Sequence, residues 1–428
     1  VQLAQAAITR IATATQAQSS PVSSIAIALP AGTAAGDLLL AQVAVRGGSG
    51  NPITPPAGWT QLLLDNRGTT IRQGVYYRFA AAGEPATHTW SFSASDRAAG
   101  GMVSYRGVDP IAPVHVSSTR NNAASATVST NNIATTLSDA QIVAFFGTAR
   151  TSSFSAAAPD ITELYDASTG AGPNGLTIMM ADGLQQSAGT VANRSGTAAD
   201  SAENIGQLVA LKPAAVLRAD YHFDECGYSG AAGQVLDDTG AFHATPRNGL
   251  NTSSPGLLVR YGNLDTYARW AQSAIPLARD WSLSVWFNKP FVASGSRYYV
   301  LASVAGGGDL LYLDRNANYR WGVYTTAGTT NGSLQFGTLA NGWHHLVLIG
   351  RGATSYLYID GVLRDQVNRK ATGTLTYLGT SYDSVNSADA QGFRAPIDEM
   401  MIWDHALDPA QINAIRANQL AGNNWDGS

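Results

Sequence analysis

The sequence predicts an all-β protein made of two tandem antiparallel β-sandwiches of the jelly-roll type, with a short helix near the C-terminus. Three observations predict it. Strand-like alternation recurs along the chain, clusters of Gly, Pro, Asn and Ser interrupt it at short intervals, and helical periodicity is confined to one segment. Many short strands at regular spacing are typical of sandwiches and barrels. Hydrophobic residues make up 45% of the 428 positions, which is enough for full cores.

Short segments of the first half show the alternation that a half-buried strand requires. In residues 88–92, the side chains of His88, Trp90 and Phe92 lie on one face, because successive side chains of a strand point to opposite sides. Residues 24–30 repeat the pattern with isoleucine and leucine. We therefore expect strands throughout this half.

A domain boundary is expected at residues 212–216, Lys-Pro-Ala-Ala-Val, which follow the apolar strand 207–211. Proline and small residues add little to a core, so this segment is typical of a short linker. We expect an N-terminal domain over residues 1–213 and a C-terminal domain over residues 217–428.

The first domain contains two pairs of similar segments. Residues 36–45 resemble residues 139–146, and residues 100–106 resemble residues 205–211. A domain with two similar halves would give this pattern, and so would chance similarity between β-strands. Both explanations remain open from the sequence.

The one helical segment lies close to the C-terminus. Asp408 can cap a helix, Pro409 suits its first position, and Ile412 and Ile415 are three residues apart. We expect a short helix packed on the second sandwich.

Charge and composition limit the function. Charged residues are only 13% of the chain and the net charge is −4, so nothing favours nucleic acid or an anionic membrane surface. The apolar stretches are far shorter than the roughly 20 residues that a membrane-spanning helix needs. We expect no membrane insertion. The start at Val1 implies that the chain is either processed or trimmed. With the richness in Ala, Thr, Ser and Gly, a processed chain predicts a protein that is secreted or held on a bacterial cell surface. We expect the single cysteine, Cys226, to be a buried thiol; an intermolecular disulfide is the alternative.

Several segments of the second half resemble the laminin-G-like group of concanavalin A-type sandwiches, and they occur in that family's order. They include its Asp-rich loop, its central strand, its Trp-His and Tyr-x-Asp-Gly hairpin and its closing strand. The matching segments are 221–225 (Tyr-His-Phe-Asp-Glu), 235–240 (Val-Leu-Asp-Asp-Thr-Gly), 281–287 (Trp-Ser-Leu-Ser-Val-Trp-Phe), 342–347 (Gly-Trp-His-His-Leu-Val), 356–361 (Tyr-Leu-Tyr-Ile-Asp-Gly) and 397–403 (Ile-Asp-Glu-Met-Met-Ile-Trp).

Two further resemblances concern smaller parts of the chain. Residues 223–226, Phe-Asp-Glu-Cys, are similar to the start of secreted bacterial proteins associated with mannose-sensitive pilus loci. The first domain resembles a β-sandwich of bacterial surface and phage-tail-like proteins in four segments, at residues 29–37, 56–60, 75–78 and 105–109. That group shares no chemistry, so the resemblance implies a fold and no function.

The laminin-G-like resemblance implies a calcium site beside the first strand and the Asp-rich loop. Ca²⁺ takes six to eight oxygen ligands. The carboxylates at the matching positions are those of Glu225, Asp237, Asp238, Asp398 and Glu399. Residues 240–242, Gly-Ala-Phe, replace the family's Gly-Asn-Gly and so remove one side-chain oxygen. The alternative is that these acids cap turns and meet Arg394 or backbone amides.

The sequence predicts no enzyme. Related glucanases place acids as Glu-x-Asp-x-x-Glu on one strand face, and no such run occurs here. The chain also has no His-Glu-x-x-His, no Gly-x-Ser-x-Gly and no Gly-rich phosphate loop. Two carboxylates brought together from distant strands would still suit a glycosidase, so a glycoside hydrolase stays as the least favoured alternative.

Two sets of apolar residues are candidates for contact with partners. Aromatic residues near expected loops could stack on sugars, or could instead fill the core; these are Tyr298, Tyr319, Trp321 and Tyr382. The first residues of the chain could join the sheet edge of a neighbouring molecule, or could form their own domain's first strand. The apolar positions concerned are Val1, Leu3, Ile8 and Ile11.

Together these features predict a non-catalytic extracellular structural or adhesive protein. We expect a subunit of a bacterial surface fibre, pilus or layer, with copies of itself, other appendage subunits or glycans as partners. The main alternative is a secreted, calcium-dependent glycan-binding module that acts alone.

Overall fold

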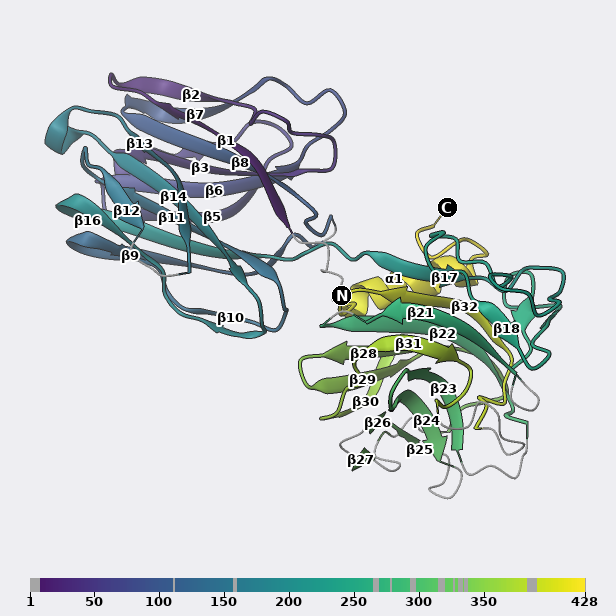
Figure 1. Cartoon of the computed structure of the whole chain (residues 1–428). Coiled ribbons are helices and arrows are strands. Elements are labelled where there is room, and N and C mark those ends of the chain that lie inside the picture. Colours follow the sequence, from purple (N-terminus) through teal and green to yellow (C-terminus); the bar gives the residue numbers. More distant parts are fainter. Residues whose placement is uncertain are drawn as a thin grey trace. The chain divides into compact units, whose positions relative to one another are not determined.

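A computed structural model describes residues 8–110, 112–156, 160–264, 269–277, 279–292, 298–314, 320–325, 328–329, 334, 338–382 and 391–427. Their contacts divide the chain into two compact units, one ending at Ala214 and the other starting at Ala215, within the expected linker (Figure 1). The predicted all-β class is confirmed, as is the single short helix close to the C-terminus. None of the described helices is long and apolar enough to cross a membrane.

The first half of the N-terminal unit is a sandwich of two sheets. Within the described residues, one sheet has the strand order β1-β8-β3-β6-β5 and the other the order β2-β7-β4. A short 3-10 turn, Gly48–Gly50, precedes β4. The strands are β1 (Thr9–Ala17), β2 (Val22–Ala28), β3 (Leu38–Arg46), β4 (Ile53–Thr54), β5 (Thr60–Arg67), β6 (Ile71–Phe79), β7 (Thr87–Asp96) and β8 (Ala98–Arg106).

The second half is built in the same way. Its larger sheet has the order β12-β16-β11-β14-β13 with β9 paired to β16, and its smaller sheet consists of β10 and β15. A 3-10 turn, Gly172–Asn174, precedes β14. The strands are β9 (Val114–Ser129), β10 (Ile133–Thr135), β11 (Ala140–Thr148), β12 (Phe154–Ala156), β13 (Thr162–Ser168), β14 (Thr177–Gln185), β15 (Gly189–Val191) and β16 (Ser195–Leu211).

Five strands of the large sheets of the two halves follow the same order. The order β1-β8-β3-β6-β5 of the first half corresponds to β9-β16-β11-β14-β13 of the second. The similar sequence segments fall on β3 and β11, and on β8 and β16. Of the two explanations left open by the sequence, two similar halves is therefore the correct one, and the expected single sandwich is in fact a pair.

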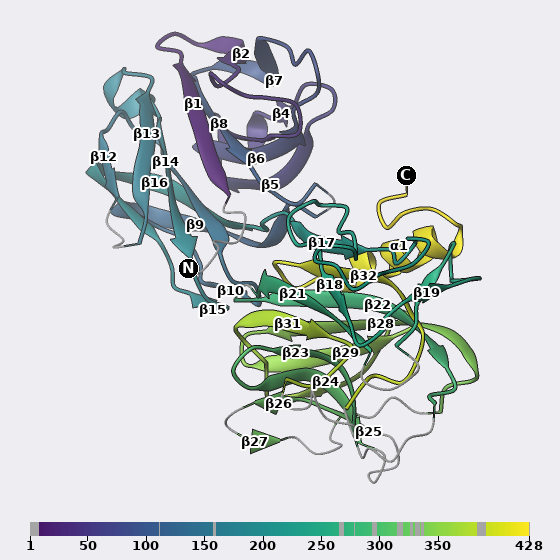
Figure 2. The same ribbon diagram turned by 45° about the vertical axis from the view of Figure 1, so that its right-hand side comes forward.

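The large sheets of the two halves face each other, as Figures 1 and 2 show. One core cluster joins them, with Leu40 and Val103 from the first half and Phe145 and Val209 from the second. Strand β3 is apolar on both faces because it has a core on each side, and a continuous apolar run is expected of such a strand.

Buried glutamines cross the interface between the halves. The Gln42 amide donates to Gln73 Oε1 at 2.9 Å and to the carbonyl of Phe146 at 3.0 Å. The Gln73 amide donates in turn to Gln207 Oε1 at 3.0 Å. Buried polar groups that lose their partners cost about 1–3 kcal/mol each, so this chain of bonds favours one register of the two sheets over any shifted one.

The C-terminal unit is a second kind of sandwich. In the described part of the chain, its larger sheet has the order β19-β20-β32-β22-β28-β29-β30 with β17 paired to β32, and its smaller sheet the order β18-β21-β31-β23-β24-β25. Strands β26 and β27 pair separately. The bounds are β17 (Leu217–Tyr221), β18 (Thr245–Arg247), β19 (Thr252–Ser253), β20 (Tyr261–Gly262), β21 (Trp270–Pro276), β22 (Trp281–Lys289), β23 (Tyr298–Val304), β24 (Gly308–Asp314), β25 (Arg320–Gly322), β26 (Tyr324–Thr325), β27 (Gly328–Thr329), β28 (Gly342–Arg351), β29 (Thr354–Ile359), β30 (Val362–Val367), β31 (Thr374–Leu378) and β32 (Ile397–Trp403).

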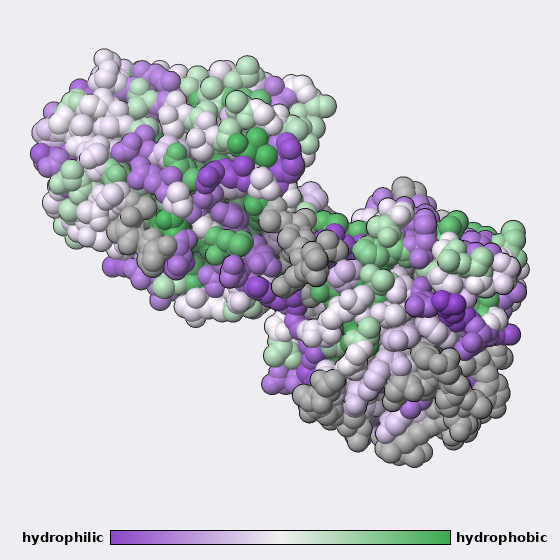
Figure 3. All heavy atoms as spheres, viewed as in Figure 1, coloured by the Kyte–Doolittle hydropathy of each residue, from purple (hydrophilic) through white to green (hydrophobic). Residues whose placement is uncertain are grey.

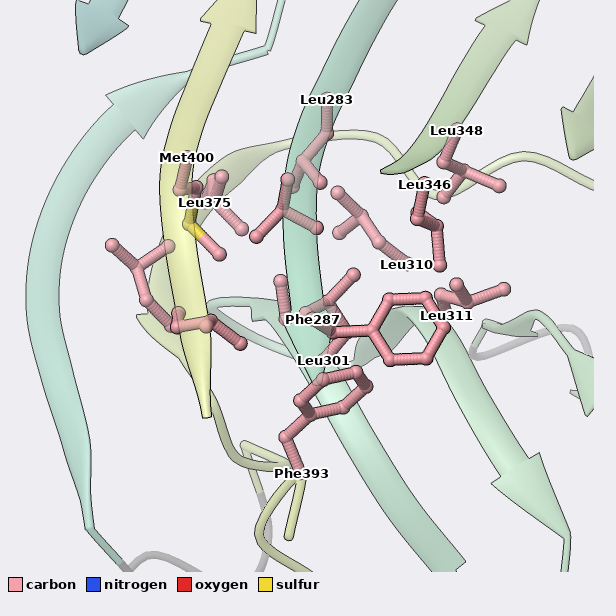
Figure 4. Packing of buried hydrophobic residues seen from close by; sticks show 14 of the residues in the cluster. Leu283, Phe287, Leu301, Leu310, Leu311, Leu346, Leu348, Leu375, Phe393 and Met400 are labelled. Atoms are coloured by element: carbon pink, nitrogen blue, oxygen red, sulfur yellow. The ribbon is translucent and has the colours of Figure 1, made fainter. Parts of the chain in front are cut away.

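The core of this unit lies between its two main sheets. Figure 4 shows Leu283 and Phe287 of β22 meeting Leu310 and Leu311 of β24, with Met400 of β32 beside them. These side chains are buried. Burial of one such side chain stabilises a fold by roughly 1.5–3 kcal/mol. The many buried side chains of this core therefore fix the two sheets relative to each other, and with them the ends of the loops that connect the strands.

The helix α1 (Pro409–Leu420) begins as predicted. The Asp408 carboxylate accepts a hydrogen bond from the Gln411 backbone amide, and the Gln411 side chain accepts one from the Asp408 amide, which is a capping box. Ile412 and Ile415 are buried in a cluster with residues of β28 and β32. The helix therefore covers the outer face of the larger sheet.

Candidate functional site

The loop that follows β17 is organised by one buried carboxylate. Asp237 Oδ1 accepts hydrogen bonds from the backbone amides of Asp220 (2.7 Å) and Thr239 (3.1 Å). Its Oδ2 accepts from the amides of Ala241 (3.1 Å) and Phe242 (2.8 Å) and from the Thr239 hydroxyl (2.6 Å). Aspartates commonly shape turns by accepting from the amides that follow them. Here Asp237 fixes the whole Asp-rich loop.

His222, directly after β17, lies among carboxylates. Its Nδ1 is 2.9 Å from Glu399 Oε1, and its Nε2 is 3.5 Å from Asp220 Oδ2 and 3.4 Å from Asp238 Oδ2. Hydrogen bonds to Asp220 and Glu399 raise the pKa of His222 to about 11. The imidazole is therefore a cation at neutral pH, positioned between three acids.

A buried chain of hydrogen bonds continues from His222 toward the helix. Glu399 is a non-glycine residue with a φ of 51°, at an irregular point of β32, and its side chain is fully buried. The Gln419 amide donates to Glu399 Oε2 at 3.0 Å, and Trp286 Nε1 donates to Gln419 Oε1 at 2.8 Å. This chain ties the end of α1 to both β22 and the loop.

Asp398, the neighbour of Glu399, has different partners. Its carboxyl accepts from the backbone amides of Leu257 (2.7 Å) and Glu399 (3.0 Å). Burial raises the pKa of Asp398 to about 8. This side chain is therefore largely protonated at neutral pH, and it holds a loop in place.

Glu225 and Cys226 lie further along the same loop. Glu225 accepts from the Tyr228 hydroxyl and the Leu236 amide, both at 2.6 Å. The thiol of Cys226 is exposed, so the prediction of a buried cysteine is wrong. The loop is held by its polar bonds, and the cysteine adds nothing to the core.

Two pockets adjoin His222. The larger, of about 340 Å³, is lined by His222, Asp224, Glu225, Leu236 and Asp238. The smaller, of about 230 Å³, is lined by Leu217, Asp220, His222, Asp238, Thr239, Asn424, Trp425 and Asp426. His222 and Asp238 line both, so the two pockets share a wall.

The five acids matched to a calcium site do not converge on one point. The Asp237 oxygens take five hydrogen bonds, Asp398 binds backbone amides, and a histidine cation sits between Glu399 and Asp238. No group of three or more His, Cys, Asp or Glu side chains that could hold a metal ion occurs in the described residues. Asp237 and Asp398 therefore order turns, as the alternative has it. Calcium binding by the remaining acids stays a prediction.

The four aromatic residues predicted to stack on sugars differ in their burial and in their neighbours. Trp321 is completely buried and packs on Phe287 and Phe393 at ring distances of 6.1 and 6.2 Å, so it fills the core and cannot stack on a sugar. Tyr298 is half-buried with its ring edge on Tyr312, and Tyr382 stacks on Tyr324 at 6.0 Å. Tyr319 lies outside the described residues.

Two of the four residues predicted to join a neighbouring molecule make their contacts within their own domain. Ile8 is 8% exposed in the core between the two halves, and Ile11 lies in β1, which pairs with β8. These contacts agree with the alternative that the segment forms its own domain's first strand. Val1 and Leu3 lie outside the described residues.

Several residues of the pockets were not predicted. Asp220 and His222 occupy alternate positions at the end of one strand, a pattern that places both side chains on one face. This pattern is a signal in the sequence by which both residues could have been predicted as part of a site. Trp425 and Asp426 lie beyond the helix, and nothing in the sequence indicates that this segment returns to the loop after β17.

Comparison with known proteins supports the fold of the second unit. Residues 262–413 match the sequence model of the concanavalin A-like lectin/glucanases superfamily. The C-terminal unit therefore has this fold, which fits a carbohydrate-binding or structural role. No curated protein matches the chain.

Among solved structures, the chain is similar to domain 4 of AbnA, an extracellular arabinanase of Geobacillus stearothermophilus, in complex with arabinotriose. The identity is 16%, the TM-score is 0.33, and the match covers 46% of this chain and 97% of that one. It is also similar to Trypanosoma rangeli sialidase, with 14% identity, a TM-score of 0.33, 48% of this chain and 33% of that one. A SAP-like pentraxin of Limulus polyphemus matches with 16% identity, a TM-score of 0.25, 34% of this chain and 73% of that one. The chain spans only a third of the sialidase.

Proposed function

We propose that this chain is a non-catalytic adhesive protein of a bacterial cell surface, and that its C-terminal unit binds a saccharide at the two pockets beside His222. One observation carries the proposal: carboxylates on a loop fixed by backbone hydrogen bonds line two open pockets, together with an indole and an aliphatic side chain. Saccharide sites combine a few well-placed polar groups with apolar or aromatic walls. Here the carboxylates accept from sugar hydroxyls, while Leu236 and Trp425 contact the apolar faces of the rings.

In an adhesive protein, the N-terminal unit would act as a spacer. Its two halves share a core cluster and the buried Gln42–Gln73–Gln207 chain, so they are coupled as one body. The surface of the chain is poor in charge, and Figure 3 shows pale, weakly polar residues over much of the visible face of both units. Such a surface suits close packing against other neutral surfaces.

A glycan array probed with the full chain tests the saccharide site. We expect binding to a limited set of glycans, and a loss of at least about tenfold in affinity for Asp238→Asn, because a hydrogen bond to a charged group contributes about 1.5–3 kcal/mol. Asp238 is 66% exposed in its side chain, so the change should leave folding intact. Asp200→Asn in the N-terminal unit, also exposed, is the matched control. The proposal fails if no glycan binds, or if both variants bind alike.

A second candidate function is a subunit of a surface fibre, pilus or layer. It is favoured by β30, the last strand of its sheet, where Val362 and Leu363 are 54% and 47% exposed. Uncovered apolar edge strands are ready to pair with another sheet edge. Electron microscopy of the purified chain is expected to show ordered filaments or sheets, and dispersed single particles at high concentration would contradict this candidate.

A further inference from the structure

A buried histidine in the first half of the N-terminal unit holds a tryptophan of a neighbouring loop. His88, in β7, and Trp59, in the loop between β4 and β5, are 4% and 7% exposed. Trp59 Nε1 donates a hydrogen bond to His88 Nδ1 at 3.2 Å, and the two ring centroids are 5.2 Å apart. Strand β4 belongs to the smaller sheet and β5 to the larger one, so this bond fixes a loop that joins the two sheets.

This hydrogen bond determines which form of the imidazole fits the closed loop. Because Nδ1 accepts from the indole, it carries no proton, and the neutral ring keeps its one proton on Nε2. Nε2 lies 3.1 Å from Glu84 Oε1. A protonated imidazole has an N–H at both nitrogens, so its Nδ1–H would face the N–H of Trp59 with no acceptor between them. The bond between His88 and Trp59 therefore exists only while His88 is neutral.

The charged groups beside His88 do not reverse this preference. The Glu84 carboxylate is already paired with Arg78, whose Nε is 3.2 Å from Oε1, and it accepts from the Ala81 amide at 2.7 Å. Burial lowers the pKa of His88 below 6.5; attraction by Glu84 opposes this change, and repulsion by Arg78 adds to it. On the adjacent strand β2, the residue opposite His88 is Ile27, which has no charge. His88 is therefore neutral at pH 7.

We propose that His88 is a pH-sensitive switch, which releases Trp59 and the loop of residues 55–59 when the imidazole takes up a proton. Once the loop is open, water reaches the ring and a proton can bind at Nδ1, so acid favours the open form. The closed form is fully stable above pH 6.5. Below that value each opening takes up one proton, and the ratio of open to closed molecules should rise about tenfold per pH unit until the lowered pKa of the closed form is reached.

Opening also changes what the N-terminal unit presents to its surroundings. In the closed form the Trp59 ring makes an edge-to-face contact with Trp90, with 5.0 Å between the ring centroids. Release of the loop ends this contact and brings an indole ring to the surface in acid. The switch lies in the N-terminal unit, so it does not depend on the saccharide site of the C-terminal unit.

Solvent exchange of the Trp59 indole proton, followed by NMR in the full chain with isotope-labelled tryptophan, tests the switch. The chain has nine tryptophans, and the signal that is lost in Trp59→Phe identifies Trp59. After correction for the intrinsic pH dependence of exchange, we expect its rate to rise about tenfold per pH unit below pH 6.5. The internal control is Trp281, whose Nε1 donates to the Ala371 carbonyl at 3.1 Å, because this acceptor does not titrate.

His88→Gln separates the switch from a general effect of acid. Glutamine has an oxygen that can accept from Trp59 but does not titrate in this range, so the corrected exchange rate should become independent of pH. A Trp59 rate that stays constant below pH 6.5 in the original protein, or that rises equally in His88→Gln, overturns the proposal.

If His88→Gln does not fold, Trp59→Phe tests the same bond from its other side. Loss of the hydrogen bond to Nδ1 removes an interaction made only by the neutral ring, so the pKa of His88, measured by NMR, should rise by roughly 0.5–1. An unchanged pKa of His88 in this variant overturns the proposal.

Discussion

Replacement of His222 by glutamine is expected to lower the free energy of unfolding of the C-terminal unit by about 3–5 kcal/mol, the usual cost of removing one partner from a buried ion pair. The imidazole cation lies between Glu399, Asp220 and Asp238. Without it, the first two carboxylates are left buried without a counter-charge. Glutamine has a similar volume, so the loss would be mainly electrostatic.

Urea unfolding of the full chain measures this effect as a shift of the transition that belongs to the C-terminal unit. The matched control is His115→Gln in the N-terminal unit, which should leave that transition unchanged. Because the chain has two compact units, the two transitions must be separated before a free energy is assigned. An unaltered midpoint in the His222 variant would show that the carboxylates do not depend on this cation.

The pH dependence of the free energy of unfolding gives a second test of the ion pairs of His222. The pKa of His222 is raised from 6.5 to about 11, so its pairing stabilises the folded unit fully below pH 6.5 and is lost as the pH rises through about 11. The pKa of Asp398 is raised from 3.8 to about 8, so stability also falls as the pH rises between these values, because the carboxyl ionises in the unfolded chain while it stays protonated in the fold. In His222→Gln the fall between pH 8 and about 11 should disappear, while the fall between pH 3.8 and 6.5, to which only Asp398 of these two residues contributes, should remain.

The fold was largely predictable because its signals are local. Alternation along residues 88–92 marks β7, and Asp408 with Pro409 marks the start of α1. The doubling of the N-terminal unit was not decided by the sequence, because unrelated β-strands share the same apolar composition. The equal strand order of the two halves decides it, and that order is set by long-range pairing.

The site was predictable only in part. The resemblance located Asp237, Asp398 and Glu399, yet it could not tell which of their oxygens would be taken by backbone amides, since those contacts depend on how distant loops pack. The same holds for Trp321, whose neighbours in sequence are polar or small but whose ring faces Phe287 and Phe393. The aromatic residue type alone suggested that Trp321 could stack on a sugar. Its position in the core depends on packing between distant strands, which the sequence does not show.

Replacement of Asp237 by alanine is expected to cost on the order of 4 kcal/mol of stability in the C-terminal unit. Four backbone amides and one hydroxyl would lose their acceptor at once. The neighbouring Asp238→Ala is the matched control: its side chain is 66% exposed, and loss of an exposed ion pair costs about 0–1 kcal/mol. Thermal unfolding of the two variants, measured side by side, checks the difference.

The same pair of variants tests the role of calcium. If Asp237 acts only through the loop hydrogen bonds, the unfolding of the original protein and of both variants should be unaffected by added calcium or by a chelator, since a ligand stabilises a fold only in proportion to its binding. A calcium site at these acids would instead make the original protein more stable with the ion, and Asp237→Ala would lose that gain. An increase in the unfolding midpoint with calcium concentration would therefore mean that His222 gives way to the metal, and that the carboxylates rearrange around it.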